Sequence, residues 1–119
     1  MVWIDMHPAD NENAAHRQAE QLISPRIAHF HDPVQRAGKA FAEAMGARGR
    51  VSWDIYLVFQ PDVQWAETAP HPHAWVHQLA GALWANPFRF RTGKALKCEL
   101  SKMLMENFQP ELKYSGEFK

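Results

Sequence analysis

Apolar and polar residues alternate along residues 51–60, which hold the densest apolar run of the chain. This period of two predicts a β-strand, because successive side chains of a strand point to opposite faces. One face is wholly apolar, and we expect it to be buried; it consists of Val51, Trp53, Ile55, Leu57 and Phe59. The other face carries Asp54 and Tyr56, so we expect it to be half covered or to form the polar floor of a cleft. The sequence therefore predicts that the core lies along this strand and that helices cover it.

Four stretches have apolar residues at helical spacing, and they cover residues 13–23, 33–45, 73–86 and 94–108. The second is the best delimited, because Asp32 suits the N-cap, Pro33 suits the first helical position and Gly46 suits the stop. Gly38 lies inside this helix, where a glycine costs about 1 kcal/mol relative to alanine. We therefore expect Gly38 to permit close packing.

The third helix, over residues 73–86, would bury the stripe Val76, Leu79, Ala80 and Leu83. The last helix would bury the stripe Leu96, Leu100, Met103, Leu104 and Phe108. Both stripes follow the spacing at which side chains share one helical face.

Two further strands are predicted, at residues 2–5 and 88–91, while residues 26–31 fit either a helix or an extended chain. Residues 61–72 contain three prolines and form a long loop, either a plain connection or a lid. We expect a flexible tail over residues 111–119. The order, roughly β-α-α-β-α-β-α, predicts an α+β fold or a small α/β sandwich, in one domain over residues 1–119, with a small sheet centred on strand 51–60.

The composition narrows the class of partner and the compartment. Thirteen Lys and Arg residues balance thirteen Asp and Glu residues, which argues against nucleic acid and leaves a homo-oligomer open. Cys98 is the only cysteine, and we expect it to be a passive thiol in a reducing compartment. We find neither a secretory signal nor an apolar run long enough for a membrane, so we expect a cytoplasmic protein. Five tryptophans suit either core filling or a pocket, for which Trp65 and Trp75 are the candidates.

Seven histidines include a cluster at the predicted start of the third helix: His71, His73 and His77. His73 and His77 are four residues apart, so on a helix they would share one face and could bind a transition metal together. A third ligand could come from His71, from residues 29–32 or from Asp54. The other interpretation is that these are surface imidazoles near a helix N-terminus, where the dipole favours the neutral form.

A basic and aromatic surface is predicted over residues 88–102, where a single acid, Glu99, stands among five cations. Its candidate anion-binding residues are Arg89, Arg91, Thr92, Gly93, Lys94 and Lys97. The turn at residues 92–94 precedes a helix N-terminus, whose free amides attract a phosphate or a carboxylate. The other interpretation is a solvated helix face beside an edge strand that its arginines protect from aggregation.

We therefore expect a non-catalytic binding or assembly domain that uses the surface of residues 88–102 to hold an anionic ligand or a protein partner. The alternative is a small metal- or histidine-dependent enzyme with its site at His71, His73 and His77, oriented by Asp54. Dinucleotide-binding, nucleophile-elbow and paired-cysteine motifs are all missing from the sequence.

Overall fold

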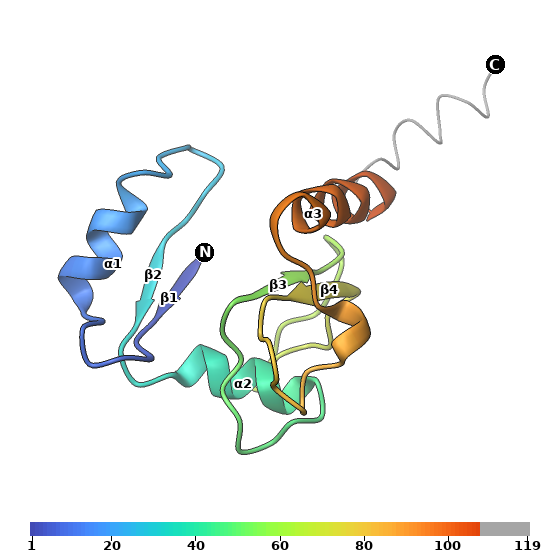
Figure 1. Cartoon of the computed structure of the whole chain (residues 1–119), viewed down its shortest axis with the longest axis horizontal. Coiled ribbons are helices and arrows are strands. Elements are labelled where there is room, and N and C mark those ends of the chain that lie inside the picture. The colour runs from blue at the N-terminus through green and yellow to red at the C-terminus, as the bar shows by residue number, and fades with distance from the viewer. Residues whose placement is uncertain (108–119) are drawn as a thin grey trace. The chain divides into compact units, whose positions relative to one another are not determined.

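A computed structural model describes residues 1–107 and has an α+β fold with the element order β1-α1-β2-α2-β3-β4-η1-α3 (Figure 1). The predicted fold class is therefore confirmed. By its internal contacts the chain divides into two compact units, Met1–Trp53 and the residues from Asp54 onward. The single domain over residues 1–119 stays a prediction, and the predicted tail at 111–119 lies outside the described residues.

The first unit contains a parallel pair of strands, β1 (Val2–Ile4) and β2 (Phe30–Asp32). A parallel pair requires a crossover connection, and α1 (Glu12–Ala19) supplies it (Figure 1). The strand predicted at residues 2–5 is confirmed, and residues 26–31 lead into a strand. The helix predicted at residues 13–23 ends at Ala19, since α1 buries no residue that would hold a further turn in place.

The second helix, α2 (Arg36–Ala44), begins later than predicted because Asp32 still belongs to β2. The Asp32 carboxylate nevertheless caps the helix, since it accepts hydrogen bonds from the backbone amides of Arg36 and Ala37, each at 2.8 Å. Gln35, the residue directly before α2, occupies the N-cap position without a capping side-chain bond and has a left-handed backbone conformation with φ 62°. Gly46, with φ 83°, follows the helix as predicted.

The central strand is shorter than predicted: β3 covers Ile55–Val58 and not residues 51–60. Asp54 interrupts the run, because its φ of 48° is left-handed and incompatible with a strand. The prediction of a fully buried apolar face was also wrong, since all five of its residues are only half-buried. The buried residues lie on the opposite face, at Ser52 and Val58, which are 1% and 8% exposed.

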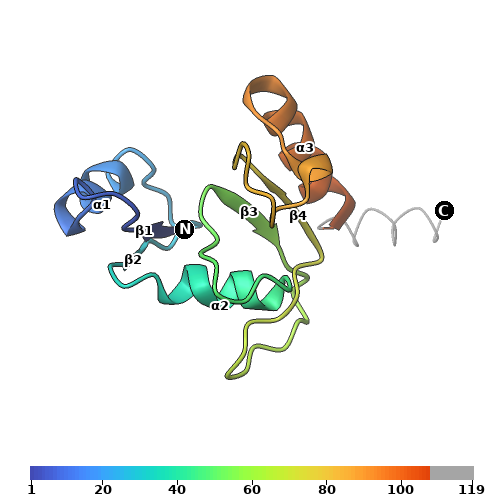
Figure 2. The same ribbon diagram turned by 60° about the horizontal axis from the view of Figure 1, so that its bottom comes forward.

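The helix predicted over residues 73–86 was wrong, because Ala74–His77 form β4, antiparallel to β3 (Figure 2). Trp75 and Val76 favour a pleated surface, and pairing with β3 outweighs the helical spacing of the apolar residues. Of the predicted buried stripe, Val76 and Leu79 are buried, whereas Leu83 is 99% exposed. Turns fill residues 80–85.

The strand predicted at residues 88–91 was wrong as well. Pro87–Arg89 form a short 3-10 helix, η1, and the Asn86 side chain caps it by accepting from the Phe88 amide at 3.0 Å. Phe90 then forms an isolated bridge with His77. Proline at the start of this segment removes a backbone donor and favours the helical turn.

The last helix is confirmed as α3, Gly93–Asn107, and it packs on the β3–β4 pair. The core of the second unit consists of Val58, Val76, Leu96 and Met103. Leu100 of the predicted stripe packs against this cluster, Leu104 is 53% exposed, and Phe108 lies outside the described residues. Within residues 1–107, none of the helices has the length and apolar character that crossing a membrane requires.

Candidate functional site

The outer edge of β4 is covered by the segment that contains η1. The guanidinium Nη1 of Arg89 donates a hydrogen bond to the carbonyl of Trp75 at 3.1 Å, and the backbone amide of Arg91 donates to the carbonyl of His77 at 3.0 Å. The guanidinium carbon of Arg89 also lies 4.9 Å from the centre of the Trp75 ring. Since the cation stacks on the ring and bonds the strand, its position is fixed.

A hollow of about 330 Å³ lies beside this contact. Its apolar lining consists of Ala74, Trp75, Val76, Phe88 and Met103. Its polar lining consists of Asn86, Arg89, Arg91, Glu99, Lys102 and Glu106. We call it the Trp75 hollow. A hollow lined by both apolar side chains and convergent charged groups is a candidate site for orienting a small polar group.

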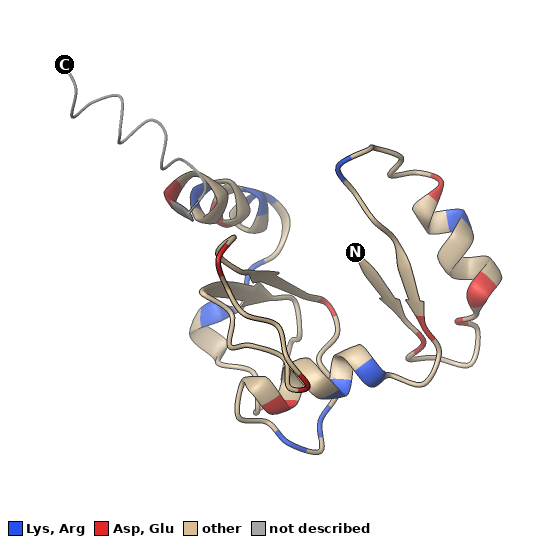
Figure 3. Cartoon of the chain, turned by 180° about the vertical axis from the view of Figure 1, so that it is seen from behind, with Lys and Arg blue, Asp and Glu red and all other residues tan. Residues whose placement is uncertain are grey.

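Cations outnumber carboxylates in the Trp75 hollow, with Arg89, Arg91 and Lys102 against two glutamates. Figure 3 shows lysines and arginines on α3 and on the segment that leads into it. Arg91 uses Nη1 to donate to the carbonyls of Phe88 and Phe90, at 2.7 and 2.9 Å. A guanidinium has five N–H donors, so each arginine keeps donors that can reach a carboxylate or a phosphate.

The structure brings together only some of the predicted anion-binding residues. Arg89 and Arg91 line the Trp75 hollow, whereas Thr92, Gly93 and Lys94 are exposed around the start of α3. Lys97 lines a different hollow on α3, together with the exposed Cys98. Lys102, one of the five cations of the predicted surface but not one of its candidate anion-binding residues, also lines the Trp75 hollow.

The two tryptophans predicted to form a pocket have different neighbours. Trp65 is 57% exposed, and its ring lies 4.8 Å from that of Phe59. Trp75 is 9% exposed and contacts both Arg89 and His77; the centres of the Trp75 and His77 rings lie 5.9 Å apart. Only Trp75 therefore belongs to the candidate site.

His77 has a structural role that its position in the histidine cluster did not predict. It is 1% exposed, its Nδ1 accepts from the Leu79 amide at 3.0 Å, and its Nε2 donates to the Asn86 carbonyl at 2.9 Å. These partners require the neutral ring with its proton on Nε2. Both ring nitrogens of His77 are engaged in hydrogen bonds to the backbone. In this arrangement His77 has no nitrogen with which to bind a metal ion or to act as the base of the alternative enzyme.

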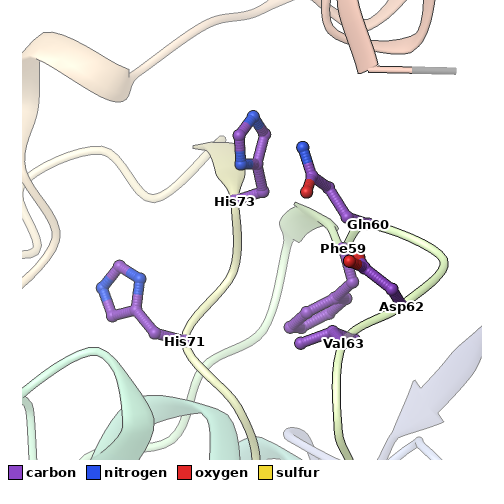
Figure 4. Close-up of a pocket in the computed structure, with 6 residues that line it drawn as sticks. All are labelled: Phe59, Gln60, Asp62, Val63, His71 and His73. Atoms are coloured by element: carbon purple, nitrogen blue, oxygen red, sulfur yellow. The ribbon is translucent and has the colours of Figure 1, made fainter. Parts of the chain in front are cut away.

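His71 and His73 line a separate hollow of about 270 Å³ with Phe59, Gln60, Asp62 and Val63 (Figure 4). Both histidines come from the segment entering β4, and the other four residues come from the segment leaving β3. His71 donates from Nδ1 to the Pro72 carbonyl at 2.9 Å. Among residues 1–107, no three His, Cys, Asp or Glu side chains lie close enough to hold a metal ion.

Asp54 and Tyr56, the predicted polar cleft residues, are joined by Gln78. The backbone amide of Gln78 donates to the backbone carbonyl of Asp54 at 2.9 Å, and the side-chain Nε2 of Gln78 donates to the Tyr56 hydroxyl at 3.2 Å. The Asp54 side chain is exposed, so it needs none of the partners expected for a buried carboxylate. Neither residue lines the Trp75 hollow or the hollow at His71.

A histidine–carboxylate pair in the first unit was not predicted. His31 donates from Nε2 to the Asp5 carboxylate at 2.8 Å, and both side chains are 22% exposed. His29, the other histidine of residues 29–32, accepts from the Trp3 indole at 3.1 Å and donates to the Leu22 carbonyl at 3.0 Å. Only the pairing of β1 with β2 brings these groups together, so no local motif could have revealed them.

No protein-family model, curated protein or solved structure matches this chain.

Proposed function

We propose that the chain is a cytoplasmic, non-catalytic binding domain that holds an anionic group of a ligand or protein partner at the Trp75 hollow. The stacking of Arg89 on Trp75, at 4.9 Å, carries this proposal. A cation that is already ordered loses little conformational freedom when an anion binds, so more of the interaction appears as affinity. The single cysteine suits a reducing compartment.

The surroundings of Arg89 support an anionic group with an apolar part. Phe88, which is 85% exposed, lines the hollow together with Trp75 and Met103. A carboxylate or phosphate would contact Arg89 and Arg91, while an attached apolar group would cover Phe88. Glu99 and Glu106 line the same hollow and would disfavour ligands of high negative charge.

The test is an NMR titration of the full chain with inorganic phosphate and with a short poly-glutamate peptide. We expect saturable shifts at Arg89, Arg91 and Phe88 that weaken as salt is added, because added ions screen exposed charges. The double variant Arg89→Glu, Arg91→Glu should lose them. The double variant Arg36→Glu, Lys39→Glu, an equal charge change at two exposed residues of α2, is the matched control and should keep them.

Two results would overturn the proposal. One is that neither probe gives saturable shifts at the Trp75 hollow. The other is that the shifts persist in the Arg89→Glu, Arg91→Glu variant, because the binding group would then lie elsewhere.

A further inference from the structure

The two outer edges of the β3–β4 pair differ in their hydrogen bonding. In an antiparallel pair, the backbone groups of alternate residues point toward the partner strand, and those of the residues between point away. The backbone amide of Gln78 donates to the backbone carbonyl of Asp54. The backbone groups of Asp54 and Tyr56 therefore face β4, and those of Ile55 and Leu57 point away from it. On β4, the carbonyls that point outward are bonded by Arg89 and Arg91.

In the described part of the second unit, residues 54–107, the outer edge of β3 lacks such hydrogen bonds. Within residues 1–107, the outward N–H and C=O groups of Ile55 and Leu57 make no hydrogen bond. Backbone groups of this kind normally find a partner in the folded protein, in water or in another chain. The outward groups of Ile55 and Leu57 are therefore the ones with which a further strand would pair.

The sequence of β3 lacks most features that protect an edge strand from pairing. It reads Ile-Tyr-Leu-Val, without a charge, a proline or a bulge. Only its length of four residues limits the pairing. The net charge of the chain is zero, so two copies do not repel each other at long range.

We propose that β3 pairs with β3 of a second copy of this chain, antiparallel about a twofold axis at Tyr56. In this register Ile55 of each copy lies opposite Leu57 of the other, and every outward N–H and C=O of both residues is bonded. The two-stranded sheets then merge in the order β4-β3-β3-β4. A second copy fits because this pattern is complementary to itself, as a twofold interface requires.

This interface is independent of the proposed anion binding, since Arg89 and Arg91 cover the opposite edge of the sheet. The variant Arg89→Glu, Arg91→Glu should therefore keep the dimer. Failure of one proposal leaves the other untouched.

The first measurement is amide hydrogen exchange by NMR on the full wild-type chain at rising protein concentration, with sedimentation velocity on the same samples. We expect a dimer, with exchange at Ile55 and Leu57 slowed about tenfold or more as it forms. The amides of Tyr56 and Val58 bond β4 in the monomer, so their exchange should change far less. A chain that stays monomeric, or a dimer in which Ile55 and Leu57 still exchange fast, overturns the proposal.

The second measurement uses a matched pair of proline variants. Leu57→Pro removes an N–H that points away from β4, so we expect a folded monomer. Tyr56→Pro removes an N–H that bonds β4, so we expect it to disrupt the sheet. A folded Leu57→Pro that still dimerises overturns the proposal, and if Leu57→Pro fails to fold, the exchange of the wild-type chain decides.

Discussion

The carbonyl of Gly38 accepts a hydrogen bond from the backbone amide of Ser52 at 2.9 Å. The two segments lie so close that a Cβ atom on Gly38 would fall 2.9 Å from the Ser52 carbonyl oxygen and 2.6 Å from Cγ1 of Val51. The close packing predicted at this glycine of α2 is therefore confirmed, and it joins the helix to the segment before β3.

Gly38→Ala tests this contact by the sign of its effect. If the site were open, alanine would stabilise α2 by about 1 kcal/mol through helix propensity. Because the new methyl group would overlap backbone as well as side-chain atoms, we expect a net loss of about 1–3 kcal/mol in the free energy of unfolding. Denaturant unfolding monitored by circular dichroism measures it, and any stabilisation would contradict the close approach.

His77→Ala should destabilise the second unit. The substitution removes the partner of the Leu79 amide, which is buried, and of the Asn86 carbonyl, which is partly buried; an orphaned buried amide alone costs about 1–3 kcal/mol. His73→Ala is the matched control, because His73 is exposed and should change the unfolding free energy by less than about 0.5 kcal/mol. Equal effects of the two variants would show that His77 does not hold residues 79–86.

The tautomer of His77 gives a second readout on the wild-type chain. The proton should lie on Nε2, since the Asn86 carbonyl can only accept. Nitrogen chemical shifts of the imidazole distinguish the two tautomers. A proton on Nδ1 would be incompatible with the bond from the Leu79 amide.

The elements predicted well are those with local signals. The helix α2 follows from Asp32 and Gly46, which mark its ends, and α3 follows from its long apolar stripe. Strand β4 was missed because Val76 and Leu79 also fit a helix, and short apolar runs do not distinguish the two. Pairing with β3 decides between them, and that pairing is a tertiary effect.

The candidate site was predicted in part, for the same reason. The excess of cations at residues 88–102 can be read from the sequence, and it pointed to Arg89 and Arg91. The contact between Arg89 and Trp75 spans fourteen residues and exists only because β4 is a strand whose Trp75 carbonyl points away from β3. Likewise, Asp5 meets His31 only through the parallel pairing of β1 with β2.

Asp10 should make stability depend on acid pH. Its carboxylate accepts from the backbone amides of His7 and Met6, at 2.7 and 2.8 Å, and these bonds hold the pKa of Asp10 below its ordinary value of 3.8. The folded state therefore favours the ionised form. The resulting stability is complete above pH 3.8 and is lost as the pH falls through the lower, folded pKa.

Titration of the Asp10 carboxyl carbon by NMR measures this, and we expect a midpoint below 3.8. Asp10→Asn removes the charge, so its stability relative to wild type should recover at the acid end of the profile. A midpoint at or above 3.8 would contradict the two backbone hydrogen bonds.

Ser52→Ala should leave stability unchanged or raise it. The Ser52 side chain is 1% exposed, and its hydroxyl has no hydrogen-bond partner in the part of the chain that the structure describes. Removing a buried polar atom that has no partner also removes its desolvation cost, so we expect a gain of zero to about 1 kcal/mol in the free energy of unfolding. Ser24→Ala is the matched control and should lose about 0.5–1.5 kcal/mol, since the Ser24 hydroxyl accepts from the Arg26 amide at 3.2 Å. A loss at Ser52 as large as that at Ser24 would mean that the Ser52 hydroxyl makes a hydrogen bond in solution.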